Sequence, residues 1–124
     1  LQQGAGVLGA FLETTPVFAQ GTSEAGKHFQ RGVSLFNEAD YAGALVEFNT
    51  AYKLSGNYKL LYNIAICQTA LKDYAIATET FTKYLSEGGS EISAARKADV
   101  QDRLSKLALN VTRVKVTTDA PAGA

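Results

Sequence analysis

Hydrophobic side chains recur along the first part of the chain at the three- and four-residue spacing of an α-helix. A first stripe consists of Ala25, Phe29, Gly32, Val33, Leu35 and Phe36, and a second of Tyr41, Ala44, Leu45, Phe48, Ala51 and Tyr52. Asp40 immediately precedes the second stripe, where an aspartate favours the N-cap of a helix. Gly56 follows it, where glycine supplies the left-handed backbone that ends helices. We therefore predict a helical hairpin over residues 24–56.

The same pattern then starts again and predicts a second hairpin over residues 57–89. Its helices are expected at 58–71 and 74–86, with Asp73 as the N-cap of the later helix. Gly88 and Gly89 mark its end. The helical hairpin is a recognised supersecondary unit, and the pattern predicts two of them in succession.

The two predicted hairpins are related by an internal repeat. The pattern Asp40-Tyr41-x-x-Ala44-x-x-x-Phe48 recurs 33 residues later as Asp73-Tyr74-x-x-Ala77-x-x-x-Phe81. At the same offset, Gly32 aligns with Ala65. We expect these small residues where helices cross closely, with Phe48 and Phe81 filling the space beside each crossing. A repeat of this length indicates a stacked helical architecture.

Residues 90–110 form an amphipathic pattern that predicts a long helix capping the second hairpin. Its apolar stripe comprises Ile92, Ala95, Val100, Leu104, Leu107 and Ala108, and its polar face comprises Arg96, Lys97, Asp102, Arg103 and Lys106. From residue 111 onward, valines alternate with threonine and basic residues. This alternation predicts an extended tail over 111–124, as at the start of a β domain.

Residues 1–22 form an apolar N-terminal segment with two interpretations. An apolar run at 4–12 is followed by Pro16 and by Val17-Phe18-Ala19-Gln20, which resembles the end of a secretory signal peptide. The alternative is a plain amphipathic first helix. The signal-peptide interpretation places the protein in the periplasm or outside a bacterial cell. No stretch reaches the roughly 20 apolar residues of a membrane-spanning helix.

Charge and composition exclude several classes of function. Twelve basic and 12 acidic residues balance, so nucleic acid is not an expected partner. Cys67 and His28 form the one pair suited to thiolate chemistry, but Cys67 lies in an apolar helical stretch where a thiol has no reason to ionise. Metal-ligand spacings, phosphate-binding glycine loops and catalytic triads are missing from the sequence. We therefore expect no enzymatic activity, no cofactor and no metal ion.

Gly32, Ala44, Phe48 and Ala51 match the residue pattern of the tetratricopeptide repeat (TPR) family, which the chain resembles over about residues 24–90. The resemblance implies an all-α fold of antiparallel helical hairpins stacked as a short right-handed superhelix with a C-terminal capping helix. The tail resembles the opening of a PEGA-type β domain, which follows such helices in secreted bacterial proteins.

The TPR resemblance also implies a concave groove that binds a peptide or protein segment. Its groove positions correspond here to Phe29, Val33, Phe36, Asn37, Lys59, Tyr62, Asn63, Ile66 and Ala70, with Arg96 and Arg103 extending the groove from the capping helix. Some members of the family clamp the terminal carboxylate of a peptide with lysine and asparagine side chains. Of those clamp positions, only the one at Asn63 is clearly matched in this chain. Phe29 and Val33 occupy the first-hairpin clamp positions, so an apolar segment is the expected ligand.

Two alternatives to a dedicated adaptor function remain at this stage. The repeats could instead be a structural spacer or a self-assembly domain of a larger envelope protein with no ligand of their own. Self-association through residues 1–20 is a further hypothesis, in which the apolar residues 7–11 occupy the groove of the same molecule or of a neighbour.

Overall fold

The computed structural model describes the backbone of residues 23–119 and the side chains of residues 23–111. This part of the chain contains α-helices, one short 3₁₀ helix and no strand, which confirms the all-helical class predicted from the sequence. The elements are α1 (Glu24–Asn37), α2 (Tyr41–Ser55), α3 (Lys59–Ala70), α4 (Tyr74–Gly88), η3 (Gly89–Glu91) and α5 (Ala94–Asp119). Helices α1 and α2 pack against each other, and so do α3 and α4.

Local side-chain chemistry explains where these helices begin and end. At the start of α2, Oδ1 of Asp40 accepts a hydrogen bond from the backbone N–H of Gly43 at 2.9 Å, as expected for an N-cap. Gly56 ends α2 with a φ of 68°, in the left-handed region. Asp73 precedes α4 as predicted, but its side chain accepts no capping hydrogen bond. The two repeats therefore have an aspartate at the same position before the second helix, but only Asp40 makes the capping hydrogen bond.

The turns inside the two hairpins have the same backbone conformation. Ala39 and Lys72 lie 33 residues apart and are both left-handed, with φ values of 64° and 68°. In each turn the next residue, Asp40 or Asp73, donates its N–H to a carbonyl five residues earlier, at 2.8 Å and 2.9 Å respectively. The sequence repeat is therefore also a repeat of backbone structure.

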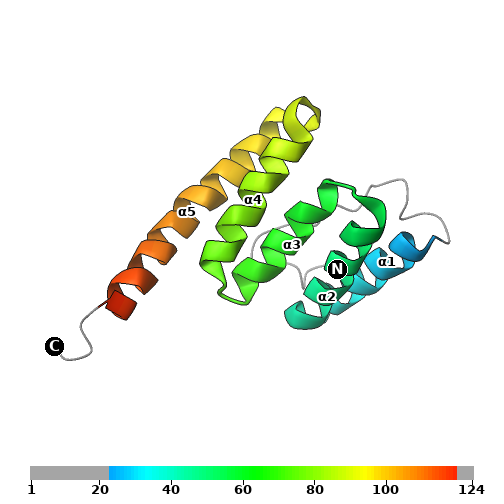
Figure 1. Ribbon diagram of the computed structural model, residues 1–124, viewed down its shortest axis with the longest axis horizontal. Helices are drawn as coiled ribbons and strands as arrows, with labels where there is room; N and C mark the ends of the chain where they lie inside the picture. The colour runs from blue at the N-terminus through cyan, green and yellow to red at the C-terminus, as the bar shows by residue number, and fades with distance from the viewer. Residues whose placement is uncertain (1–22, 120–124) are drawn as a thin grey trace.

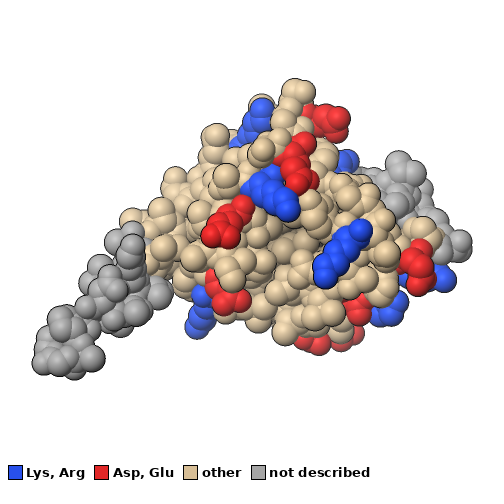
Figure 2. Space-filling model, in the orientation of Figure 1, with Lys and Arg blue, Asp and Glu red and all other residues tan. Residues whose placement is uncertain are grey.

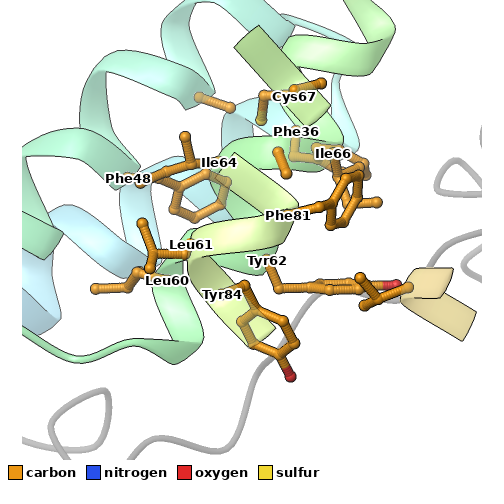
Figure 3. Packing of buried hydrophobic residues seen from close by; sticks show 14 of the residues in the cluster. Phe36, Phe48, Leu60, Leu61, Tyr62, Ile64, Ile66, Cys67, Phe81 and Tyr84 are labelled. Atoms are coloured by element: carbon orange, nitrogen blue, oxygen red, sulfur yellow. The ribbon is translucent and has the colours of Figure 1, made fainter. Parts of the chain in front are cut away.

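The helices pack against one another in chain order, from α1 to α5, as Figure 1 shows. The small residues predicted at the helix crossings, Ala44, Ala65 and Ala77, are fully buried, and so are Phe48 and Phe81. Figure 3 shows these aromatic rings within the same apolar cluster as the side chains of α3. Small and large residues thus alternate through the core as the repeat pattern predicted.

Helix α3 is the central element of this core. Its residues 60–67 are all buried, on every side of the helix, because α2 packs on one side and α4 on the other. In the described part of the chain, the equivalent face of α1 is exposed. The α1 residues Lys27, Arg31 and Ser34 are exposed, whereas Leu60, Ile64 and Cys67, each 33 positions later, are buried.

The prediction of an extended tail from residue 111 is wrong for residues 111–119. Helix α5 spans 26 residues and runs on to Asp119, past the first turn of α4 (Figure 1). Neither glycine nor proline occurs between Ala94 and Asp119, so nothing interrupts the backbone hydrogen bonds. Val111 and Val114 are three residues apart, a spacing that a helix also accommodates.

The remaining predictions for the ends of the chain lie outside the described residues. They are the signal-peptide or amphipathic-helix interpretation of 1–22, self-association through 1–20, and an extended conformation at 120–124.

Candidate functional site

The residues predicted to line a groove divide into two groups in the structure. Phe29, Phe36, Tyr62, Asn63 and Ile66 are buried, each no more than 3% exposed. Val33, Asn37, Lys59, Ala70, Arg96 and Arg103 retain accessible surface. A partner can therefore reach only the second group in this structure.

The accessible residues lie toward two ends of the hairpins. Asn37 is the last residue of α1 and Ala70 the last of α3, and they occupy equivalent positions of the repeat, 33 residues apart. Val33 lies one turn before Asn37. Lys59 begins α3 at its other end, and Arg96 lies in the first turn of α5. The end of the molecule with Lys59 and Arg96 has more charged and aromatic side chains in contact than the end with Asn37 and Ala70.

Tyr62, Arg96 and Arg103 meet around Asp99, a residue of α5 that the sequence analysis did not single out. The hydroxyl of Tyr62 donates to Oδ2 of Asp99 at 2.8 Å. Nε of Arg103 donates to the same oxygen at 3.1 Å, and a guanidinium nitrogen of Arg96 lies 3.7 Å from it. These contacts join α3 to α5.

The same cluster holds the guanidinium of Arg96 in a defined place. Its central carbon lies 4.0 Å from the centroid of the Tyr62 ring, a favourable distance for a cation–π contact. Burial, together with the hydrogen bond to Asp99, raises the pKa of Tyr62 to about 12. Tyr62 therefore stays neutral over the whole physiological pH range, and its hydroxyl keeps the hydrogen bond that it donates to Asp99.

An open pocket of about 250 Å³ lies beside this cluster. It forms where the start of α3, the end of α4, η3 and the start of α5 come together. Its lining residues are Tyr58, Lys59, Tyr84, Glu91, Ile92, Ser93 and Arg96. Tyr84 and Ile92 are buried and form its apolar wall, with the Tyr58 ring 5.6 Å from that of Tyr84. Figure 3 shows Tyr84 beside Tyr62 at this end of the core.

Sequence reasoning found two of the seven pocket residues, Lys59 and Arg96. A signal for Asp99 was present, since it lies three residues after Arg96 and four before Arg103, the spacings at which helix side chains pair. The other lining residues are near helix ends that are distant in the chain. No local pattern shows that these ends converge.

Cys67 and His28, the pair considered for thiolate chemistry, have separate surroundings in the structure. Cys67 is fully buried, and burial raises the pKa of its thiol to about 12. Nδ1 of His28 lies 2.7 Å from Oε1 of Glu47, which joins α1 to α2, and Nε of Arg31 lies 3.9 Å from the same oxygen. Within residues 23–111, no three His, Cys, Asp or Glu side chains are grouped as a metal site requires.

The charged surface is mixed in sign. On the face shown in Figure 2, basic and acidic residues are interspersed with wide uncharged areas. None of the helices in the described part of the chain combines the length and apolarity needed to cross a membrane. Comparison with protein-family models, curated proteins and solved structures finds no match to this chain.

Proposed function

We propose that this protein is an interaction module, in which TPR-like hairpins bind a segment of another protein. The observation that carries the proposal is the repeat itself. Two hairpins with the same turn conformation and the same residue pattern are stacked side by side. Arrays of this kind present extended surfaces built from equivalent positions of successive units, and such surfaces commonly bind peptides.

The proposal includes the stacking of the hairpins as a short right-handed superhelix, closed by α5 as a capping helix. Accessible residues at equivalent repeat positions support a shared binding surface, since Asn37 is exposed and Ala70 is partly exposed at the ends of α1 and α3. Val33 lies one turn before Asn37 on α1, whereas Lys59 and Arg96 lie at the opposite end of α3 and at the start of α5.

The second candidate is a structural spacer or self-assembly domain without a dedicated ligand. The polar outer face of α1 argues against end-to-end stacking of copies there, because Lys27, Arg31 and Ser34 stand at positions where α3 has buried apolar residues. Spacing of a neighbouring domain remains the stronger form of this alternative.

A matched pair of double variants separates an adaptor from a spacer. The test variant is Asn37→Arg with Ala70→Arg, which places bulky charges at equivalent repeat positions of α1 and α3. The control is Ala42→Arg with Ala75→Arg, at equivalent exposed positions of α2 and α4. None of the four substituted positions belongs to the buried core, unlike Phe29 and Ile66.

The measurement is capture of a binding protein from a native envelope extract by the purified chain, followed by reconstitution with that protein after purification. We expect the wild type and the control to bind it directly, and the test variant to lose about tenfold or more in affinity. Equal binding by the test and control variants would contradict recognition through this surface. A failure of the wild type to bind any protein would favour the spacer.

A further inference from the structure

Helix α5 is the last layer of the stack, where it packs against α4 (Figure 1). Among its residues 94–111, whose side chains the structure describes, only Val100 and Leu107 are buried. Helix α1, at the other end of the stack, buries the larger side chains of Phe29 and Phe36. In stacked helical arrays each layer is stabilised by its direct neighbours, and elements with few buried apolar side chains open most easily. We therefore expect α5 to open at a lower free energy than the other helices.

The turn before α5 is tightly packed and marks where such an opening begins. Gly88 ends α4, and a Cβ atom added to it would lie 2.5 Å from side-chain atoms of Ile92 and Tyr58. Ile92 is 6% exposed, so it anchors the turn in the core. The next residue, Ser93, caps α5, since its Oγ accepts a hydrogen bond from the backbone N–H of Arg96 at 3.1 Å. The anchor and the cap separate a fixed turn from the helix that follows.

Asp99 joins α5 to α3. Its Oδ2 accepts hydrogen bonds from the Tyr62 hydroxyl and from Nε of Arg103, and it lies 3.7 Å from a guanidinium nitrogen of Arg96. The two guanidinium groups also lie over the ring of Tyr62, at 4.0 Å and 6.0 Å from its centroid. We call these four side chains the Asp99 junction. Because one carboxylate is shared, its loss weakens several charge-assisted contacts together.

The ring of Tyr62 lies between α4 and α5. On the α4 side its centroid is 5.8 Å from that of Phe81 and 5.6 Å from that of Tyr84. On the α5 side the guanidinium of Arg96 covers it, and Tyr62 is 1% exposed. Tyr62 is also one of the residues that the TPR resemblance assigns to the binding groove. Detachment of α5 therefore uncovers a predicted groove residue.

We propose that α5 is a lid that detaches as a unit, and that the Asp99 junction sets how often it opens. In the open state a segment of the bound protein takes the place of α5 and packs on the Tyr62 ring. The stripe that it replaces is Val100, Leu104 and Leu107, so an amphipathic helix with the same spacing is the fitting ligand. Use of the open state by a partner rests on the proposed function, whereas the opening itself does not.

Native-state hydrogen exchange of the full chain measures the opening of each helix. In the wild type we expect the amides of residues 98–110 to exchange through one common opening, about tenfold or more faster than the slowest amides of α3. Urea should accelerate exchange in α5 less steeply than in α3, because opening one helix exposes less surface than global unfolding. Equal protection and equal urea dependence in the two helices would show that α5 opens only with the whole protein, which overturns the proposal.

A matched pair of variants tests the Asp99 junction, and each removes one charge from a carboxylate shared between two helices. Asp99→Asn should speed exchange in α5 about fivefold. The control is Glu47→Gln in α2, because Glu47 contacts His28 and Arg31 of α1. It should speed the slowest exchange in α3, which follows global unfolding, and leave exchange in α5 within about twofold of the wild type. Equal acceleration of α5 by both variants, or no acceleration by Asp99→Asn, would overturn the proposal.

The partner captured from the native extract tests whether the lid controls binding. Asp99→Asn should bind that protein about fivefold more tightly than the wild type, because a larger fraction of the chain is open. No gain in affinity would show that α5 does not gate recognition. The exchange measurements use the chain alone, so they are independent of the capture experiment with the Asn37 and Ala70 variants. If the wild type binds no protein, the proposed function fails, and hydrogen exchange still decides whether α5 opens as a unit.

Discussion

Gly32 of α1 lies directly against the ring of Phe48 in α2. A Cβ atom added to Gly32 would be 2.6 Å from Cε1 of Phe48, closer than real side chains approach. Phe48 is completely buried, so its ring has little room to move away. The equivalent pair in the second hairpin, Ala65 and Phe81, accommodates a methyl group. The first hairpin is therefore the more closely packed of the two at this crossing.

The contact between Gly32 and Phe48 predicts that Gly32→Ala destabilises the protein. Glycine to alanine inside a helix normally stabilises by about 1 kcal/mol. Here, overpacking against Phe48 costs about 1–3 kcal/mol, so the net effect is a loss. Urea unfolding followed by circular dichroism measures the difference. Ser34→Ala, at an exposed position of the same helix, is the control and should be neutral or slightly stabilising. A gain in stability for Gly32→Ala would show that the ring yields freely.

The left-handed conformation of Ala39 and Lys72 predicts that glycine at these two positions does not lower the stability of the protein. A non-glycine residue in this conformation costs roughly 1–2 kcal/mol, while glycine costs up to about 1 kcal/mol through the entropy of the unfolded chain. Ala39→Gly and Lys72→Gly should therefore each leave stability unchanged or raise it by up to about 1 kcal/mol. Ala42→Gly, in the first turn of α2, should lower it by as much as 1 kcal/mol. Thermal or urea unfolding of the three variants decides the question. Equal losses in all three would contradict the assigned turn conformation.

The hydrogen bond from Tyr62 to Asp99 predicts a pH-dependent effect of Tyr62→Phe. Near neutral pH the variant should be about 1 kcal/mol less stable, because Asp99 loses one of its donors. The pKa of Tyr62 is raised from 10.0 to about 12 in the folded protein. Between these values the unfolded chain has released the proton and the native state retains it, so the stability of the wild type falls as pH rises.

Tyr62→Phe has no hydroxyl to titrate at this position, so its stability does not fall for this reason as pH rises. The stability difference between the wild type and Tyr62→Phe should therefore shrink or reverse as pH rises from 10 to 12, by an amount of about 2–3 kcal/mol. Urea unfolding at each pH measures it, with Tyr74→Phe as a control that subtracts general alkaline effects. A difference that stays constant across this range would contradict a protonated, buried Tyr62.

The open face of α1 predicts that self-association can be introduced by substitution. The variant carries Lys27→Leu, Arg31→Ile and Ser34→Ala, which give α1 the apolar character of its counterpart face on α3. We expect it to dimerise or form larger species, since a patch of this kind drives association of exposed helices. Light scattering after size exclusion measures the mass. The control places the same apolar residues at Glu79, Lys83 and Ser86, which have the same spacing on α4 and are exposed. Equal assembly of both variants would indicate nonspecific aggregation.

The sequence determined the local features of this protein, because they depend on residues that are near one another in the chain. The helix starts at Asp40 and Asp73, the stop at Gly56 and the 33-residue repeat were all predictable from hydrophobic spacing and cap residues. The small residues at helix crossings followed from the same pattern. The alternation after residue 111 was misleading, since short valine spacings fit both a strand and a helix, and α5 continues to Asp119.

Only the tertiary structure decided which of the predicted binding residues a partner can reach. Burial depends on what packs against a helix from elsewhere in the chain, and α3 is enclosed where α1 is open. Tyr62 was predicted as a groove residue, but α5 covers it with Arg96 and Arg103 around Asp99. The pocket at Lys59 and Arg96 also exists only because helix ends distant in sequence converge. A single sequence contains no local signal for such convergence, since it is a property of packing.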